Sequence, residues 1–435
     1  MIIIKPQSPI FERVIGRCKV KSGADYQLSA FCLKQDTDLG MLLYNTLTDE
    51  IIIADEKEDR EELIARRYLV PTCTDELKTV EQCRRLEQLL TRPEVSKGIQ
   101  NAVILTTTGC NARCYYCFER GCEVLTMDNK TALATADYVV RHKNPDAEFN
   151  ICWFGGEPLL NTAAMDTISL ELKQRSIPFC SSIITNGYLF NEANIRKAIE
   201  IWNLKSAQIT LDGTAETYNR TKAYVYADDP NPFETVLKNI ELLTGSGIPV
   251  SIRINLSSAN GEDLEKLIDL LAARFHGNDP VRMYVKVIYQ QTGMEALWQK
   301  HKQLSKKIRS FFPYQTVKQV ETVKFFGCEA DSETGLTVMP DGSLLCCQHF
   351  VERPQAWGSV FSEEINDAVK RWWKEAKPWE EACRTCFYAP KCYKPVHCPE
   401  AKDCYQIRRD EIREELTAYM LEAYAEWKRQ EACEL

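Results

Sequence analysis

The chain has 435 residues, of which 44% are hydrophobic, and this length can bury a large core in two or three domains. The formal net charge is -8, from 54 Lys and Arg against 62 Asp and Glu, which argues against a nucleic-acid binder or a binder of anionic membranes and favours a small or peptidic partner. No apolar run reaches the roughly 18 residues that span a bilayer, and the first residues, Met-Ile-Ile-Ile-Lys-Pro, lack the order of a signal peptide. We therefore expect a cytoplasmic protein.

Residues 1–95 read as strands followed by helices. Apolar and polar residues alternate over 26–33 and 41–53, which predicts strands, and charged segments with helical spacing follow at 57–67 and 76–90. This order predicts a small α+β module of the winged-helix kind. Its exposed sheet edge can add a strand from an extended peptide. The alternative is a packing extension without a binding role.

Residues 96–315 alternate between short apolar strands and amphipathic helical segments, which is typical of β-α units and a parallel sheet. The simplest α/β architecture for six such units is a partial (β/α)6 relative of the TIM barrel. This architecture places functional residues at the carboxyl ends of the strands. The expected strands are 102–107, 149–154, 181–185, 207–211, 250–256 and 283–289, and the expected helices are 129–140, 163–174, 192–201, 233–243 and 262–275.

Residues 316–435 carry many of the 19 cysteines of the chain. Cysteines seldom form disulfides in a reducing compartment, so we expect metal ligands. Three cysteines lie within 110–117, and eight scattered ones are expected to be small buried hydrophobes. A helix over 405–429 is expected to cap the barrel. The C-terminal cysteines are Cys328, Cys346, Cys347, Cys383, Cys386, Cys392, Cys398 and Cys404.

Cys110, Cys114 and Cys117 form the most informative motif, C-x3-C-x2-C, directly after the first expected barrel strand. Three thiolates at this spacing can hold three irons of a cubane cluster and leave the fourth iron without a protein ligand. An electron-transfer ferredoxin needs a fourth cysteine, and Cys122 is not at ferredoxin spacing. The motif therefore predicts a catalytic cluster with an open iron.

Three more motifs follow the next strands: Gly155-Gly156-Glu157-Pro158, Thr185-Asn186-Gly, and Leu211-Asp212-Gly213. Each Gly-containing turn alone is a weak signal. Their order is more specific, because the carboxyl ends of parallel strands meet at one rim of a barrel.

In this order the motifs resemble those of the radical S-adenosylmethionine (SAM) superfamily, over about residues 100–290. The triplet resembles the C-x3-C-x-aromatic-C motif of the family, with Tyr116 at the aromatic position. The resemblance implies a 4Fe-4S cluster whose open iron is chelated by SAM, with Tyr116 beside the adenine. It also implies reductive cleavage of SAM to methionine and a 5′-deoxyadenosyl radical that removes a hydrogen atom from an unactivated C–H bond.

Other residues resemble SAM contacts of the family. The GGEP segment resembles one in which backbone and Glu157 contacts hold the methionine ammonium, since glycines allow close approach and a carboxylate complements a cation. Thr185 and Asn186 resemble a ribose-contacting strand end, and Arg253 resembles a residue that pairs with the SAM carboxylate. A turn cap and a surface ion pair are the alternative interpretations. The expected SAM contacts are therefore Tyr116, Gly155, Gly156, Glu157, Pro158, Thr185, Asn186 and Arg253. Asp212-Gly213 with Arg220 resembles a segment near the substrate, without a catalytic role.

The C-terminal cysteines resemble the SPASM domain, which binds auxiliary iron–sulfur clusters in maturases of peptides and proteins. The resemblance implies two clusters, and Cys346 is either an additional ligand or a spare thiol. After Cys392 the spacing departs from the common SPASM pattern, and zinc bound with His349 or His397 is an alternative. The expected partition is Cys383, Cys386, Cys392 and Cys404 in one cluster and Cys328, Cys347 and Cys398 in the other.

The resemblance also limits the substrate. In anaerobic sulfatase maturases an Asp follows the cysteine that corresponds to Cys347, whereas this chain has Gln348, and an amide cannot act as a general base. The other branch modifies ribosomally made precursor peptides, and residues 1–95 resemble its leader-recognition module. We therefore expect a peptide maturase that forms intramolecular thioether crosslinks, with a flavodoxin- or ferredoxin-type donor of low-potential electrons. Carbon–carbon crosslinking, formylglycine formation, and a non-enzymatic iron–sulfur or zinc protein are the alternatives.

Overall fold

The computed structural model describes residues 1–9, 13–17, 23, 25–55, 57–95, 97–225, 229–278, 280–288, 294–312, 334–349, 356–374, 379–392 and 409–434. These residues divide into two compact units. The first contains the described residues of Met1–Pro93 and Glu375–Leu435, and the second contains those of Glu94–Val317 and Glu329–Lys374. In the described part of the chain, no helix is long and apolar enough to cross a membrane.

The second unit is built on a nine-stranded sheet with the order β12-β11-β10-β9-β8-β7-β13-β14-β15. Neighbouring strands from β7 to β12 pair in parallel. This confirms the predicted α/β class and the parallel sheet, and the last predicted strand lies two residues earlier than expected. The six strands are β7 (Asn101–Thr107), β8 (Phe149–Gly155), β9 (Phe179–Thr185), β10 (Leu204–Leu211), β11 (Val250–Leu256) and β12 (Val281–Val287).

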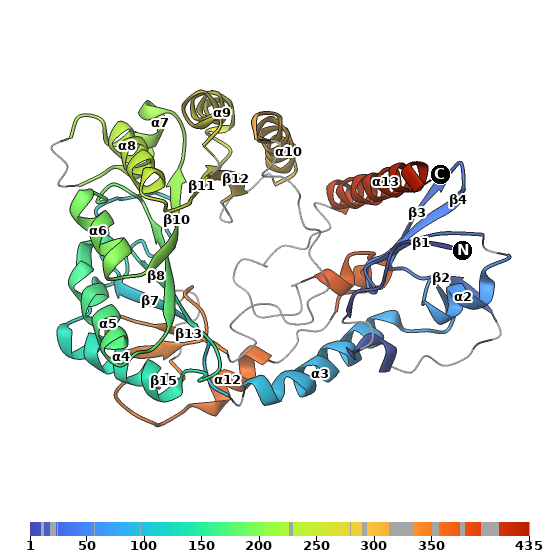
Figure 1. The fold of residues 1–435 in the computed structure, drawn as a ribbon, viewed down its shortest axis with the longest axis horizontal. Coiled ribbons are helices and arrows are strands. Elements are labelled where there is room, and N and C mark those ends of the chain that lie inside the picture. The colour runs from blue at the N-terminus through green and yellow to red at the C-terminus, as the bar shows by residue number, and fades with distance from the viewer. Residues whose placement is uncertain are drawn as a thin grey trace. The chain divides into compact units, whose positions relative to one another are not determined.

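Helices connect these strands, and in Figure 1 helices α4, α5 and α6 lie along one face of the sheet. Polar residues begin several of them: the side chain of Asp128 accepts a hydrogen bond from the backbone of Thr131, and Asn191 does the same for Asn194. Their apolar faces fill the core around the fully buried Trp153 and Trp202. The helices are α4 (Asn129–His142), α5 (Thr162–Gln174), α6 (Glu192–Glu200), α7 (Ala215–Lys222), α8 (Pro232–Gly245), α9 (Gly261–Phe275) and α10 (Met294–Phe311).

Three short strands from the cysteine-rich part of the sequence extend the same sheet. β13 (Gly335–Val338) pairs in parallel with β7, and β14 (Ser343–Leu345) and β15 (Gly358–Ser359) follow as antiparallel neighbours. Leu336, Val338 and Leu344 are buried in the barrel core, and α12 (Asp367–Lys374) follows. The described residues of 316–435 are thus divided between the two units, while the three-domain division remains a prediction.

The first unit contains an antiparallel sheet of β1 (Ile2–Lys5), β5 (Glu50–Ala54), β4 (Gly40–Asn45) and β3 (Cys32–Thr37), in that order. A smaller ladder joins β2 (Tyr26–Leu28) to β6 (Leu69–Pro71). Helices α2 (Arg60–Ala65) and α3 (Glu76–Val95) follow in the sequence.

The C-terminal helix α13 (Arg409–Glu434) also belongs to the first unit. Ile412, Leu416 and Met420 pack with Leu42 and Ile53 of the N-terminal sheet. The prediction that this helix caps the barrel is wrong for the described residues, because its buried face covers the N-terminal sheet instead.

Candidate active site at the carboxyl end of the barrel

The cysteine triplet lies on the loop that leaves the carboxyl end of β7. Cys110, Cys114 and Cys117 are all half-buried. Hydrogen bonds from backbone amides make the loop compact. The amide of Ala112 donates to the Cys110 sulfur at 3.3 Å, and the amide of Cys117 donates to the carbonyl of Cys114 at 3.2 Å. The loop returns to the sheet where the amide of Thr108 donates to the carbonyl of Leu125 at 2.9 Å.

The thiols of this loop are protonated unless a metal is bound. Burial raises the pKa of Cys110 to about 12 and that of Cys117 to about 11, and burial also raises the pKa of Cys114. In the described residues no three His, Cys, Asp or Glu side chains are already gathered as metal ligands. Three thiols on one short, partly exposed loop nevertheless fit an iron–sulfur cluster, which would displace their protons on binding.

Gly155 and Gly156 lie directly against the backbone that precedes Cys110. The amide of Gly156 donates to the carbonyl of Thr107 at 3.0 Å, and the amide of Glu157 donates to the carbonyl of Gly109 at 2.9 Å. A Cβ on Gly155 would lie 2.1 Å from the Thr107 oxygen, and one on Gly156 would lie 2.3 Å from the Gly109 oxygen. Only glycine therefore fits between the end of β8 and the cysteine loop.

Glu157 links the ends of β8 and β9 from a fully buried position. Its carboxylate accepts hydrogen bonds from the Thr185 hydroxyl at 2.7 Å, the Asn186 amide at 2.9 Å and the Leu159 amide at 3.1 Å. Burial raises the pKa of Glu157, and these donors oppose the rise. Both carboxylate oxygens are therefore held by the chain itself, and Pro158 is buried beside them at the start of a short 3₁₀ helix.

Asn186 connects this hydrogen-bonded group to the cysteine loop. Its side-chain amide donates to the Asn111 side chain at 2.7 Å and lies 4.0 Å from the Cys110 sulfur. Arg253 is two strands farther along the sheet, on β11, where its Nε donates to the Asn255 side chain at 2.9 Å. The carboxyl ends of β7, β8 and β9 thus bring together the cysteine triplet, the two glycines, Glu157, Thr185 and Asn186.

A buried ion pair, which the sequence did not reveal, lies behind the cysteine loop. Lys222 Nζ is 3.0 Å from Asp212 Oδ2, and the two side chains are 4% and 1% exposed. The Tyr116 hydroxyl donates to Asp212 Oδ1 at 2.7 Å and receives a hydrogen bond from Lys222 at 3.3 Å. Tyr116, expected beside adenine, is therefore also hydrogen-bonded to the end of β10. Nothing in the sequence distinguishes Lys222 from an ordinary lysine in the last turn of a helix.

Glu119 is a second residue that the sequence did not single out. It is 8% exposed, and neither carboxylate oxygen has a hydrogen-bond partner among the described residues. Burial raises its pKa to about 8. A carboxyl in this position is therefore mostly neutral near pH 7.

The predicted auxiliary ligands are only partly described. Cys328, Cys398, Cys404 and His397 lie outside the described residues. Cys383 and Cys392 are 6% and 8% exposed, and Cys386 is half-buried. These three residues belong to the first unit, where Arg84 Nη2 donates to the carbonyl of Cys392 at 2.7 Å.

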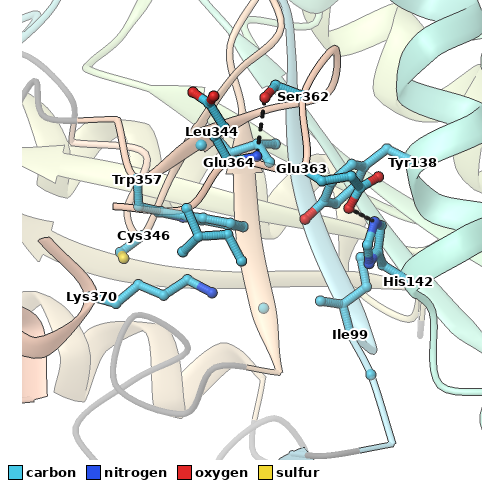
Figure 2. A pocket seen from close by; sticks show the side chains of 14 residues that line it. Ile99, Tyr138, His142, Leu344, Cys346, Trp357, Ser362, Glu363, Glu364 and Lys370 are labelled. Atoms are coloured by element: carbon cyan, nitrogen blue, oxygen red, sulfur yellow. Dashed lines mark hydrogen bonds and ion pairs between the residues drawn. The ribbon is translucent and has the colours of Figure 1, made fainter. Parts of the chain in front are cut away.

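Cys346 and Cys347 lie in the second unit, immediately after β14. Cys346 borders a pocket at the amino ends of β7 and β13, next to Trp357 (Figure 2). The Cys347 sulfur instead accepts a hydrogen bond from the His349 amide at 3.4 Å, and the His349 ring contacts Phe118, which follows Cys117. The two adjacent cysteines thus have different surroundings, and their assignment to a cluster remains a prediction.

Comparisons with known proteins agree with this geometry. Residues 104–271 match the Radical SAM superfamily. An uncharacterized protein of Methanocaldococcus jannaschii is 30% identical over 179 residues, which are 40% of this chain and 59% of that relative. The serine-type anaerobic sulfatase-maturating enzyme of Klebsiella aerogenes is 22% identical over 312 residues, or 65% of this chain and 76% of that enzyme. The chain thus spans less than two thirds of the first relative.

Solved structures share the fold. Streptococcus suis SuiB bound to its precursor peptide SuiA has a TM-score of 0.52 and 14% identity, with 86% of this chain and 96% of that chain covered. The protein anSMEcpe, bound to SAM and the Kp18Cys peptide, has a TM-score of 0.57 and 17% identity, with 75% of this chain and 99% of that chain covered. At these identities the likeness concerns the fold.

Proposed function

Because the central part of this chain is a radical SAM domain, we propose that the protein is a radical SAM enzyme that modifies a ribosomally made precursor peptide. One observation carries the proposal: the loop with Cys110, Cys114 and Cys117 is joined by direct hydrogen bonds to the GGEP segment and to Asn186. The loop proposed to bind the cluster and the strand ends proposed to bind SAM therefore belong to one hydrogen-bonded group of residues.

In this proposal the three cysteines hold a 4Fe-4S cluster. Bound together, the cluster and SAM supply a 5′-deoxyadenosyl radical that can remove a hydrogen atom from a C–H bond. The chain contributes the framework of the site: Gly155 and Gly156 let the end of β8 pack against the backbone of the cysteine loop, and Asn186 reaches toward both that loop and the strand end. Tyr116, Pro158, Thr185 and Arg253 complete the proposed SAM contacts.

Glu157 has an indirect role in this site. Its oxygens already accept three hydrogen bonds from Leu159, Thr185 and Asn186, so it fixes the spacing of β8 and β9. A hydrogen bond to a charged acceptor is stronger than one between neutral groups. We therefore assign Glu157 to positioning Asn186, in addition to any contact with the SAM ammonium.

The N-terminal sheet supports a peptide substrate. In its strand order, β1 and β3 are the two edges, and an edge strand has backbone groups free to pair with an added strand. Two solved structures that share this fold contain bound peptides: SuiB binds the precursor peptide SuiA, and anSMEcpe binds the Kp18Cys peptide. A leader bound at one edge would raise the effective concentration of the core peptide at the barrel.

Auxiliary iron–sulfur clusters in the C-terminal part form a further component of the proposal. The described candidate ligands are Cys383, Cys386 and Cys392 in one unit and Cys347 in the other. Analysis of metal and acid-labile sulfide distinguishes these clusters from zinc sites. More than four irons per chain, with an equal amount of sulfide, supports auxiliary clusters. Zinc without additional sulfide excludes them.

The proposed bond is a thioether between a substrate cysteine and a substrate carbon. The balance of this bond would require one hydrogen atom to leave to the SAM-derived radical, the thiol proton to leave to solvent, and an iron–sulfur centre, which Cys347 or the Cys383–Cys392 segment would hold, to take up one electron. A thiol bound to a metal is deprotonated, which favours sulfur over carbon as the bonding partner. Each crosslink then removes two hydrogens, and a carbon–carbon crosslink does the same.

Formylglycine formation is the second candidate, because the Klebsiella relative matures sulfatases. Gln348 follows Cys347 here, and an amide cannot take the proton that an aspartate would accept at this position. Oxidation of a peptide Ser to the aldehyde, without a crosslink, would support this candidate over the thioether.

The test uses anaerobically reconstituted protein, SAM, a strong reductant and, as candidate precursors, the short peptides encoded beside the gene. We expect 5′-deoxyadenosine and a peptide that is lighter by two hydrogens per crosslink and resists thiol alkylation at the modified cysteine. Cys114→Ala is the matched control and should produce neither. Deoxyadenosine formation at the wild-type rate by this variant would refute the cluster assignment. A modified peptide that retains all its hydrogens would refute crosslinking.

A further inference from the structure

We propose that Lys222 positions the cysteine loop and that its ammonium, balanced by Asp212, sets the reduction potential of the cluster bound there. The inference rests on the proposed function, since it requires Cys110, Cys114 and Cys117 to hold that cluster. Lys222 itself would contact neither iron nor SAM, and it acts through Tyr116 and through its charge.

The side chain of Lys222 faces the second half of the cysteine loop. Its Nζ lies 3.3 Å from the Tyr116 hydroxyl and 3.0 Å from Asp212 Oδ2. The ammonium also lies 5.9 Å from the centre of the Tyr116 ring and 5.7 Å from that of Tyr218. Tyr116 lies between Cys114 and Cys117 in the sequence, so the positive charge is next to the part of the loop that carries these two thiols.

The backbone around Lys222 holds the first half of the loop. The amide of Arg113 donates to the carbonyl of Lys222 at 2.7 Å, and the amide of Val225 donates to the carbonyl of Asn111 at 2.8 Å. Helix α7 ends immediately after Lys222, where Ala223 has a φ of 43°. One short segment therefore contacts the loop before Cys114 through its backbone and after Cys114 through a side chain.

Asp212 is itself fixed by several donors. Its Oδ1 accepts hydrogen bonds from Tyr116 at 2.7 Å and from Asn255 at 3.2 Å, and its carbonyl accepts one from Asn260 at 2.9 Å. A buried ion pair costs desolvation energy, and an apolar pair of similar size is often no less stable. Stability alone therefore gives no reason for charges at this position, whereas a nearby redox centre does.

The ammonium lies beside the part of the loop that carries Cys114, because it donates to Tyr116 two residues later. Lys222 remains charged: burial lowers its pKa, but Asp212 and Tyr116 more than compensate, so its pKa is well above the usual value. The cluster would thus lie beside a permanent positive charge and its partner negative charge.

These charges have opposite effects on reduction. Reducing the cluster adds one negative charge, which a nearby ammonium stabilises and a nearby carboxylate destabilises. Lys222→Met removes the positive charge and should lower the reduction potential. Asp212→Asn removes the negative charge and should raise it. A purely structural role for the pair predicts no such difference in sign between the two variants.

The experiment is an EPR-monitored redox titration of the reconstituted full chain without peptide. The relevant cluster is identified by the signal that changes when SAM is added. At the wild-type midpoint potential, the ratio of reduced to oxidised cluster should fall about tenfold in Lys222→Met and rise about tenfold in Asp212→Asn. For a one-electron couple, each tenfold change corresponds to a shift of the midpoint potential by about 59 mV. The double variant should lie near wild type.

Two control variants separate charge from shape. Lys222→Arg keeps the charge and should stay within about threefold of wild type in the same ratio. Lys197→Met removes a partly exposed lysine paired with Asp166 on α6 and α5 at 2.6 Å, and it should leave the ratio unchanged. Before iron is added, the backbone amide of Cys117, which donates to Cys114, should exchange with solvent faster in Lys222→Met and at the wild-type rate in Lys197→Met, because the loop loses its tie to Lys222 at Tyr116.

Shifts of the same sign in Lys222→Met and Asp212→Asn, or no shift in either at normal iron content, would overturn the inference. If Lys222→Met does not fold or load iron, the sign of the Asp212→Asn shift decides: a rise supports the inference, and a fall or no change refutes it. Failure of the proposed function is a separate outcome, in which wild-type protein itself shows no SAM-responsive cluster.

Discussion

Replacing Gly156 with alanine tests whether the GGEP segment and the cysteine loop form one rigid site. The added Cβ would lie 2.3 Å from the Gly109 oxygen, and 2.6 Å from both the Gly109 carbon and the Thr108 oxygen. All three atoms are backbone, so no side chain can rotate away. Since Cβ atoms essentially never approach within 3.0 Å of another atom, the Gly109 carbonyl must move by about 0.7 Å.

We expect Gly156→Ala to cost about 1–3 kcal/mol of unfolding free energy, as overpacking does. The same movement displaces the residue next to Cys110, and a misplacement approaching 1 Å lowers catalysis on the order of 100-fold. The assays are urea unfolding of the iron-free protein and the rate of deoxyadenosine formation by the loaded protein.

Gly245→Ala is the matched control for Gly156→Ala. Gly245 is the last residue of α8, and a Cβ there meets no atom within 4 Å. It should leave the rate unchanged and stabilise the protein by about 0.4–1 kcal/mol, because alanine restricts the unfolded chain. Gly156→Ala protein that unfolds at the wild-type urea concentration and forms deoxyadenosine at the wild-type rate would refute the close packing of the two segments.

Two further predictions concern the other unit and the auxiliary ligands. Burial alone would raise the pKa of Asp49, but Lys391 and Lys5 lower it below its usual value. The resulting stability is present above the pKa of the unfolded carboxyl, about 3.9, and is lost as the pH falls through the lower folded value. Acid unfolding monitored by circular dichroism should therefore be steeper below pH 4 in wild type than in Asp49→Asn, and equal slopes would contradict this. Cys347→Ser should lower the iron and sulfide content of reconstituted protein, whereas Cys346→Ser, at the Trp357 pocket, should leave both unchanged; equal losses would show that both cysteines bind iron.

The barrel was predictable because its signals are local. Each strand from β7 to β12 is a short segment in which apolar residues recur, and a parallel arrangement brings the motifs at the carboxyl ends together. The meeting of Cys110 with Asn186 is therefore a consequence of topology, although these residues are far apart in the sequence. The bond from the Gly156 amide to Thr107 follows from the same arrangement.

The remainder of the fold depends on pairings that no local pattern specifies. β13 has four residues and joins β7 across more than two hundred positions of sequence. Lys222 reaches Tyr116 across 106 positions, and in the sequence it resembles any solvated lysine at a helix end. Helix α13 has an apolar face through Ile412, Leu416 and Met420, but an apolar face by itself does not indicate which sheet it covers.

The N-terminal sheet and the Cys383–Cys392 segment are joined closely enough that they should not behave as separate modules. Cys383 packs in one apolar cluster with Leu77 and Val80 of α3. Lys391, between Cys386 and Cys392, forms an ion pair of 2.9 Å with Asp49, and both side chains are 1% exposed. A change in the N-terminal part should therefore alter metal binding at the cysteines.

Val80→Asp tests this coupling. Val80 is fully buried, and an unpaired carboxylate there costs several kcal/mol or forces the cluster of apolar residues to open. If Cys383, Cys386 and Cys392 bind an auxiliary cluster, the variant should lose about four irons per chain, as for one 4Fe-4S cluster, while keeping the SAM-responsive EPR signal of the barrel. Leu89→Asp changes a residue of the same helix that is 58% exposed and should keep all its iron. Full iron content in a folded Val80→Asp variant would mean that the cysteine segment binds metal independently of its packing against α3. Loss of the SAM-responsive signal would mean that the damage extends to the barrel.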